Sequence, residues 1–470
     1  MVKSFQLKIL SLLSGVLCAS LMGCSSIPDY KPPKVESPPE FKEGAMFKAS
    51  LHNATLKAET APDAWWELFN DSVLNDLEAR AIEGNQNLSG SAAAVRLAMA
   101  ATGSANAALY PTVNLGGSGN RANVVTAASP QGTTVTAQAS MSSWELDVWD
   151  RLGANAKSAA FKEQASLATL ASARLSLQAS VASTYFSLRS AEALEAVLAK
   201  SMDTYAKSLE LTQNRYAGGV ASSADVAQAQ SQLQSAKVQA DQALVTRAQL
   251  EHAMAALLGV SPSGFSLPAT GQLPAVPRVA LQVPSELMER RPDIAAAERT
   301  VAAANAAIGA ADAAFFPTLT LSANAGYRNS VLTGLFDVPN RIWSFGPSAA
   351  FALFDGGARK AASASARASY DQAVATYKQT VITALQEVED NLVAASALER
   401  EEQHQKDSLT AARKSLDVTQ NQYKAGMVSY LNVVTAQATE LNAQSSLLTI
   451  QSNHLTALSV LLKNLAGRWN

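Results

Sequence analysis

The sequence predicts a mainly α-helical protein that also contributes strands to a transmembrane β-barrel and is built from two tandem structural repeats. Three observations predict this fold. The two halves of the 470-residue chain match each other, each half contains a stretch of more than 60 residues without Gly or Pro, and each half contains segments in which apolar and small polar residues alternate. Charged residues make up only 16% of the chain, against about 25% in a typical soluble domain. Such a composition favours long helices that pack through small side chains.

The N-terminus has the pattern of an export signal. Lys3 and Lys8 provide positive charge, and an apolar stretch runs from Ile9 to Leu21. This stretch is shorter than the roughly 18 apolar residues of a membrane-spanning helix. We therefore expect residues 1–23 to be a signal peptide.

The end of this signal resembles a bacterial lipobox, in which a cysteine is lipidated and becomes the first residue of the mature chain. Leu21, Met22 and Gly23 precede Cys24, the expected lipidation site, and Ser25 follows it. In lipoproteins of this kind, a residue other than Asp after the cysteine implies sorting to the outer membrane. Residues 24–62 then form a Pro-rich tether, which we expect to be extended because Pro disrupts helices and inner strands.

An internal duplication organises the rest of the chain. Residues 216–226 match residues 423–433 at an offset of 207, and residues 109–113 match residues 315–319 at an offset of 206. About 200 residues were therefore duplicated with few insertions. The expected boundaries are a first repeat over 63–260, a linker over 261–284 and a second repeat over 285–470.

Each repeat is predicted to contain a long helical hairpin. The Gly- and Pro-free stretches 154–217 and 358–425 would form rods of roughly 90–100 Å at 1.5 Å per residue. Turns at Gly219 and Gly426 end the rods, and return helices follow over 220–258 and 427–466. The return helices keep a heptad-like spacing of small and apolar residues, which a plain coiled coil would also show.

Four segments are predicted to be strands. Clear alternation covers residues 133–146, 318–327 and 342–353, and a weaker segment begins at Val113. A half-buried soluble sheet alternates in the same way, but an exported chain favours a membrane barrel. Four strands do not close a barrel, and an open edge is not tolerated in lipid. Several chains must therefore share one barrel, with eight strands for two copies and twelve for three.

Several motifs together resemble the outer-membrane efflux protein family, the TolC-like channels, and in particular the lipoprotein branch that serves resistance-nodulation-division multidrug exporters. The motifs lie at residues 109–112, 144–149, 285–294 and 354–357 and at the two hairpin turns. The resemblance implies a homotrimer with a 12-stranded β-barrel in the outer membrane, continuous with a 12-helix α-barrel across the periplasm. It also implies two protein partners, a periplasmic adaptor (membrane fusion) protein and an inner-membrane pump, and contact with outer-membrane lipid.

The family resemblance assigns roles to the strand residues. The polar strand faces would line the pore, and the aromatic residues near the strand ends would form interfacial girdles. The expected pore-lining residues are Thr134, Thr136, Thr320, Ser322 and Asn324, and the expected girdle residues are Trp144, Trp149, Tyr327, Trp343 and Phe345.

The resemblance also implies a gate at the hairpin tips. Carried onto this sequence, it places Tyr423 on the second hairpin and Asp225 on the first, where we expect the phenol to donate a hydrogen bond to the carboxylate. Tyr216 is the equivalent of Tyr423 in the first repeat. Simple packing at the helix ends is the alternative role for both tyrosines.

Family members tend to carry acidic residues at the start of the second return helix. This sequence has Asn432 and Thr435 there, flanked by Leu431 and Val434. We therefore expect a constriction closed mainly by apolar side chains rather than an acidic ring.

Other classes of protein are disfavoured. The net charge is −2 without a Lys/Arg block, so no nucleic-acid partner is expected, and both cysteines lie within the first 24 residues, so no disulfide or cysteine metal site is expected. No catalytic constellation is apparent, and no enzyme activity, metal or cofactor is expected. The segment Glu289-Arg290-Arg291-Pro292-Asp293 is interpreted as a helix start whose charges are solvated or paired between protomers. The remaining alternatives are a duct for protein secretion and a non-conducting coiled-coil lipoprotein.

Overall fold

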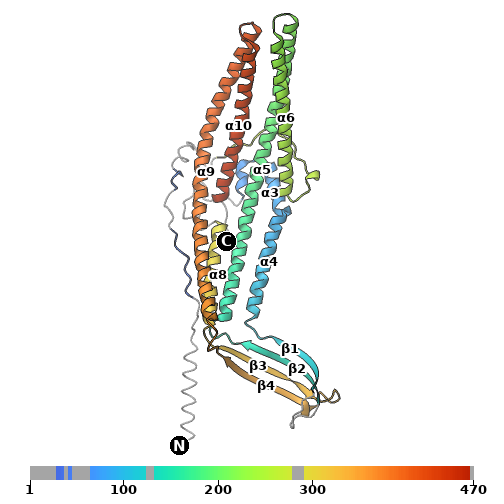
Figure 1. Ribbon diagram of the computed structural model, residues 1–470, viewed down its shortest axis with the longest axis vertical. Coiled ribbons are helices and arrows are strands. Elements are labelled where there is room, and N and C mark those ends of the chain that lie inside the picture. The colour runs from blue at the N-terminus through green and yellow to red at the C-terminus, as the bar shows by residue number, and fades with distance from the viewer. Residues whose placement is uncertain (1–27, 36–40, 45–63, 123–131, 278–290, 466–470) are drawn as a thin grey trace. The chain divides into compact units, whose positions relative to one another are not determined.

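The computed structural model describes residues 28–35, 41–44, 64–122, 132–277 and 291–465 (Figure 1). The predicted signal peptide and Cys24 lie outside these residues. The chain divides into two compact units, and each contains segments of both sequence repeats. One unit comprises Ala94–Leu167 and Ala296–Lys378 with the N-terminal residues up to Lys34; the other comprises Val35–Ala93, Ala168–Ala295 and Gln379–Asn470.

The first unit contains one antiparallel sheet with the strand order β1-β2-β3-β4. The four predicted strands are confirmed, and the weak segment from Val113 is a full strand. The last strand is shorter than predicted, because it ends at Ala350 and leaves Phe351 and Leu353 outside the sheet. The strands are β1 (Val113–Ala122), β2 (Gly132–Glu145), β3 (Thr318–Asn329) and β4 (Arg341–Ala350).

A β-bulge interrupts the pairing of β2 with β3. Met141 pairs with Ala323 and Trp144 pairs with Leu321, so β2 contains one more residue than its partner between these points. Ser143 has a φ of 49° in the left-handed region, and its backbone N–H donates to the Ser322 hydroxyl at 3.2 Å. The bulge places the Trp144 indole on the same face of the sheet as Leu321.

The two long rods are confirmed as continuous helices of 67 residues each, about 100 Å long at 1.5 Å per residue. Each is followed by a return helix, which begins three residues later than predicted. The segment before β1 contains two α-helices, which are divided at Asn85. The helices are η1 (Trp65–Phe69), α3 (Ser72–Gly84), α4 (Gln86–Ala107), α5 (Arg151–Ala217), α6 (Ser223–Leu257), η2 (Pro262–Gly264), α8 (Pro292–Ala313), η3 (Val338–Asn340), α9 (Ala358–Lys424) and α10 (Tyr430–Leu465).

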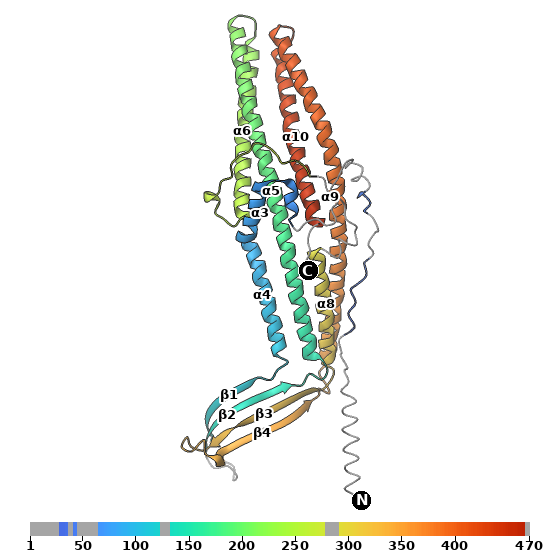
Figure 2. The ribbon, with the colours of Figure 1, turned by 180° about the vertical axis from the view of Figure 1, so that it is seen from behind.

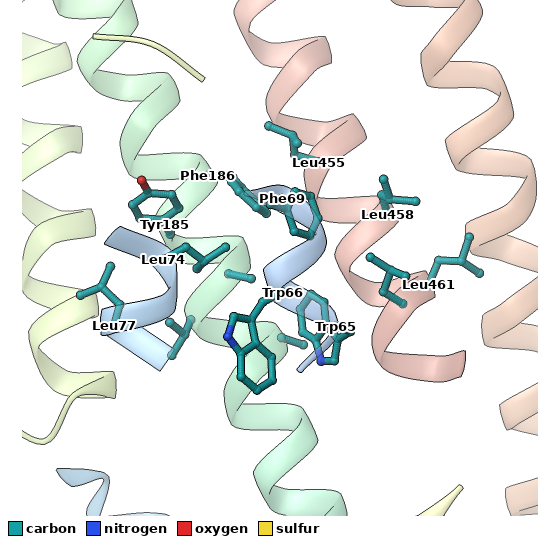
Figure 3. Packing of buried hydrophobic residues seen from close by; sticks show 14 of the residues in the cluster. Trp65, Trp66, Phe69, Leu74, Leu77, Tyr185, Phe186, Leu455, Leu458 and Leu461 are labelled. Atoms are coloured by element: carbon teal, nitrogen blue, oxygen red, sulfur yellow. The ribbon is translucent and has the colours of Figure 1, made fainter. Parts of the chain in front are cut away.

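The apolar core of the second unit gathers around η1 (Figure 3). Trp65 is fully buried, and the Phe69 ring packs on Phe186 of α5 at a centroid distance of 4.8 Å. Leucines of α3 and α10 complete this core (Leu74, Leu77, Leu455, Leu458 and Leu461). The Tyr185 hydroxyl donates to the Asp71 carboxylate at 2.6 Å, and Asp71 is the N-cap of α3.

Charged side chains attach the segment after α6 to α5. The Arg189 guanidinium is 1% exposed; it pairs with Glu192 at 2.7 Å and donates to the Pro268 carbonyl at 2.8 Å. The backbone N–H of Thr270 donates to the same Glu192 carboxylate. These contacts hold residues 265–271 along the helices without any secondary structure of their own.

The structure corrects the interpretation of the charges before α8. Arg291 is buried and pairs within its own chain, with Asp293 at 2.7 Å and with Glu387 of α9 at 3.0 Å. It is therefore neither solvated nor dependent on another protomer for a partner. Residues 285–290 of the motif lie outside the described residues.

Residues 28–35 of the tether form no helix or strand, as predicted, and the start of this segment lies on α8, whereas Lys42 and Glu43 lie in a turn whose backbone N–H groups donate to the Glu389 carboxylate of α9. The Asn305 side chain donates to the Pro28 carbonyl at 2.9 Å, and the Tyr30 hydroxyl donates to the Glu298 carboxylate. Tyr30 also packs on Phe161 of α5. Among the described residues, no helix is both long and apolar enough to cross a membrane.

Candidate functional site

One face of the sheet is polar on all four strands. The Thr320 and Ser348 hydroxyls lie 2.7 Å apart, and the Asn324 amide donates to the Ser344 hydroxyl at 2.7 Å. On the same face, Thr136 of β2 pairs with Ser118 of β1. The register places all five predicted polar residues on this one face (Thr134, Thr136, Thr320, Ser322 and Asn324).

The opposite face is apolar and uncovered among the described residues. Leu115 of β1 is 88% exposed, and Trp343 and Phe345 of β4 are 74% and 64% exposed. Since β1 and β4 are the ends of the strand order, each also has one edge without a partner strand in the described chain. Exposed apolar side chains and free strand edges together indicate a sheet whose surroundings are lipid and further strands.

Aromatic residues gather at the end of the sheet where the helices begin. The Trp144 indole donates to the Leu109 carbonyl at 3.2 Å, and the Trp149 indole donates to the Pro317 carbonyl at 2.8 Å. The Trp149 ring stacks on Phe316. Trp149 lies in the turn before α5 rather than on a strand, so its indole anchors the corner between strand and helix.

The opposite end of the sheet has its own aromatic pair. Tyr327 packs edge-to-face on Phe336 of the β3–β4 connection, with ring centroids 5.4 Å apart. The 12 residues of β3 span roughly 40 Å and, at a tilt of about 40°, cover about 30 Å of bilayer thickness. Two aromatic bands at this separation fit the two interfaces of a membrane.

The two long hairpins turn at Gly219 and Gly426, as predicted. Both glycines have a positive φ, of 71° and 75°, which a residue with a Cβ adopts at a cost. The residue after each glycine donates its backbone N–H to a carbonyl five residues back, from Val220 to Arg215 and from Met427 to Gln422. The hairpins therefore end in the same helix-terminating turn.

The hairpin ends lie side by side and share a small core (Figure 2). Tyr423 is 6% exposed and packs on Tyr430 with ring centroids 5.3 Å apart. Its hydroxyl lies 3.4 Å from the Thr212 hydroxyl of α5, and the Arg215 guanidinium lies 4.8 Å from its ring centroid. Arg215 also donates to the Lys424 carbonyl at 3.1 Å. Side chains of the first hairpin therefore contact the end of α9 in the second hairpin.

Within the described chain, Tyr423 and Asp225 form no hydrogen bond with each other. Asp225 belongs to a capping box at the start of α6. Its carboxylate accepts from the backbone N–H of Ser222 at 2.9 Å, and its own N–H donates to the Ser222 hydroxyl at 3.1 Å. Within one chain, Asp225 therefore stabilises a helix terminus.

The residues expected at the constriction separate into two groups. Leu431 is 59% exposed, and Asn432 and Thr435 are exposed. Val434 is 7% exposed and packs in the core between the two hairpins with Val433. Within one chain the helix turns Val434 toward the first hairpin, and its role at the constriction stays a prediction.

Sequence reasoning missed Thr212, Arg215 and Tyr430, which provide the direct contacts of Tyr423. The duplication carries a usable signal for one of them. Residues 211–216 and 418–423 agree closely, but the residue before the tyrosine is Arg215 in the first repeat and Gln422 in the second. Such a difference within a matched motif indicates a position with a role in only one repeat.

The same family model matches both repeats of the chain. The model of the family described as outer membrane efflux protein matches residues 77–260 and 283–467. A probable efflux pump outer membrane protein of Pseudomonas putida, TtgC, is 32% identical over 466 residues, covering 98% of this chain and 96% of that protein. The outer-membrane channel OprN is similar with a TM-score of 0.86 at 25% identity, covering 95% of this chain and 100% of that one. The open state of the MtrE channel of Neisseria gonorrhoeae gives 0.83 at 26% identity, covering 94% and 98%.

Proposed function

This chain belongs to the outer membrane efflux protein family and is the outer-membrane channel of an efflux pump, and we propose that three copies form its conducting duct. The observation that carries the proposal is the sheet, in which the described residues leave one apolar face uncovered and two strand edges unpaired. Three copies supply twelve strands and leave no edge in the lipid. The polar faces would then line the lumen, and the apolar faces would meet the bilayer.

The helical hairpins would continue the duct through the periplasm. Helices of about 100 Å are long enough to carry the lumen far from the membrane. Their tips, with Tyr423, Tyr216, Leu431, Asn432 and Thr435, would form the gate that meets a periplasmic adaptor and an inner-membrane resistance-nodulation-division pump. The duct is passive and performs no catalysis in this proposal, and its cargo is drugs or other small toxic compounds selected by the pump.

A lipid at Cys24 would anchor the chain to the outer membrane. The contact of Pro28 with Asn305 supports this, because it fixes the tether on α8. The four residues from Pro28 back to Cys24 reach at most about 14 Å. The eight residues from Asn305 to the end of α8 at Ala313 rise about 12 Å. The lipid can therefore reach the level at which the chain enters the sheet, where the membrane surface is expected.

Two measurements test the proposed function. Native mass spectrometry in detergent is expected to give three copies of the chain, and planar-bilayer recordings are expected to show channel conductance. A stable folded monomer would contradict the shared barrel, and a trimer without conductance would favour the coiled-coil stalk. Deletion of the channel that abolishes export of a secreted protein and leaves drug resistance unchanged would favour the secretion duct.

The lipid anchor has its own test. Metabolic labelling with palmitate is expected to label the wild-type protein and not the Cys24→Ala variant. Equal labelling of both would refute the lipidation site. Conductance is expected to persist in the variant, because a barrel holds a chain in the membrane far more strongly than a lipid group does.

A further inference from the structure

The apolar face of the sheet carries charge at one end only. Among the described strand residues on this face, the charged ones are Arg121 of β1 and Arg341 of β4. Both lie at what we call the far end of the sheet, the end away from α5 and α9, where β1 ends and β4 begins. No acidic residue lies on this face of the described strands. The apolar face is therefore positively charged at its far end and uncharged elsewhere.

The strand register is what places both arginines on this face. Arg341 is the direct cross-strand partner of Tyr327, and Arg121 continues the alternation that begins with Leu115. Both arginine side chains are exposed. Neither forms an ion pair or a side-chain hydrogen bond with the described residues of the chain. The described protein thus leaves two guanidinium groups on its apolar side available to an anion.

The connection between β3 and β4, residues 330–340, is a folded loop that we call the far loop. The Asn340 amide donates to the Gly334 carbonyl at 2.7 Å, and the Asn329 amide donates to the Thr333 carbonyl at 3.1 Å. Leu335 is 4% exposed. These contacts fix the backbone of the far loop and so determine which of its side chains are presented outward.

The far loop presents apolar side chains beside Arg341. The Phe336 ring packs on Tyr327 and is still 68% exposed. Since Tyr327 is the partner of Arg341 on the apolar face, Phe336 lies on the same side of the sheet. Leu332 and Val338 of the loop are each 76% exposed. A guanidinium next to exposed apolar side chains fits a molecule with an anionic head and hydrocarbon chains.

The position of the two arginines along the strands matches the level of lipid head groups. An arginine on the lipid face of a barrel is costly at the bilayer midplane and tolerated near the interfaces. Arg341 is the first residue of β4, and Arg121 is the last but one of β1. Guanidinium groups bind phosphate through paired N–H donors. Because lipid phosphates lie at both surfaces of a membrane, charge at one end only indicates recognition of a lipid in one leaflet.

We propose that Arg341, with Tyr327 and Phe336 beside it, binds the phosphate group of an anionic lipid in the outer leaflet, and that the exposed apolar side chains of the far loop contact the acyl chains of that lipid. Arg121 supplies a second positive charge on the same face. The proposal rests on the proposed function, because the apolar face must meet the bilayer and the helices must lie in the periplasm for the far end to be at the outer surface.

Native mass spectrometry of the complete protein in detergent tests the binding directly. The probe is bisphosphorylated lipid A, which carries phosphate groups and acyl chains on one sugar head. Arg341→Gln is expected to weaken its binding by about tenfold. The matched control is Arg328→Gln, because Arg328 is also exposed at the far end but lies on the polar face, opposite Thr136. This control is expected to bind like wild type. Equal affinities of wild type and Arg341→Gln, or equal weakening by both variants, would overturn the proposal.

Changes to the probe separate the phosphate from the acyl chains. Lipid A from which both phosphates have been removed is expected to bind the wild-type protein about tenfold more weakly and to bind wild type and Arg341→Gln alike. Inorganic phosphate is expected not to displace the intact lipid, because it lacks the chains. Phe336→Ala is expected to weaken binding of both forms of the lipid by about fivefold. Equal binding of the two lipids by wild type, displacement by inorganic phosphate, or an unchanged affinity in Phe336→Ala would overturn the proposal.

Hydrogen exchange on the same samples locates the bound lipid. Intact lipid A is expected to slow exchange in residues 330–340 of the wild-type protein and not of Arg341→Gln. Slower exchange elsewhere with no change in the far loop would overturn the proposed site. A protein that is monomeric and does not conduct contradicts the proposed function. A conducting trimer that binds lipid A equally with and without Arg341 contradicts only the lipid site.

Discussion

Replacement of Glu78 by Gln is expected to remove a large pH dependence from the stability of α3. Glu78 is fully buried, and neither of its carboxyl oxygens has a hydrogen-bond partner among the described residues. Burial raises the pKa of this carboxyl from its ordinary value of 4.5 to about 9. The folded protein therefore keeps Glu78 neutral at pH 7, where the unfolded chain ionises it.

The direction of the effect follows from this raised pKa. Well below pH 4.5 the carboxyl is protonated in both states, so stability does not change with pH. Between pH 4.5 and about 9 the unfolded chain releases the proton and the folded chain holds it, so stability falls by about 1.4 kcal/mol for each pH unit. From pH 6 to pH 8 the loss is about 2.7 kcal/mol, which corresponds to a factor of roughly 100 in the opening equilibrium.

Hydrogen exchange measured by mass spectrometry on the complete protein in detergent gives the opening free energy of residues 72–84. After correction for the intrinsic exchange rate, wild-type protection is expected to fall about 100-fold from pH 6 to pH 8, and protection in Glu78→Gln is expected to stay constant. Glu83 lies on the exposed side of the same helix, so Glu83→Gln should behave like wild type. A wild-type change below tenfold, or the same change in Glu78→Gln, would refute the reasoning.

Three further substitutions have defined outcomes. Phe345→Arg on the apolar face should cost about 2–4 kcal/mol and lower the assembled fraction in the outer membrane, whereas Ser344→Arg on the polar face should assemble normally. Asp225→Ala should cost about 1 kcal/mol and speed hydrogen exchange in the first turn of α6; a change in conductance instead would indicate a direct role at the gate. Asn432→Asp should shift the reversal potential toward cation selectivity, and an unchanged reversal potential would place Asn432 outside the lumen.

Local periodicity is what made most of the fold predictable. The strands follow from the alternation of apolar and polar residues. The two long helices follow from the absence of Gly and Pro over more than 60 residues, and the turns follow from Gly219 and Gly426. The capping box was also readable, since Ser222 and Asp225 have the required spacing. Its presence argues against a free Asp225 carboxylate.

The remaining features depend on contacts between distant segments. Arg291 and Glu387 are 96 residues apart, and no local pattern selects one partner over another. The burial of Val434 likewise depends on the first hairpin, which the spacing of α10 alone does not locate. The bulge at Ser143 has no glycine to mark it, although its φ is positive.

The bulge at Ser143 decides which face of the sheet each later side chain of β2 points to. Side chains alternate between lumen and lipid at every step, so one inserted residue exchanges the two environments for everything beyond it. With the bulge, Trp144 faces the side of Leu321, and Glu145, which pairs with Arg151 at 2.6 Å, faces the side of Thr320. A regular strand over the same residues would turn the indole toward the polar face and the carboxylate toward the apolar face, so the bulge offsets the extra residue. Deletion of Ser143 would remove the extra residue and the bulge together and leave both side chains on their present faces. A length change of one residue elsewhere in β2, where no bulge offsets it, is therefore far more damaging than most substitutions, whereas a deletion at the bulge preserves the alternation.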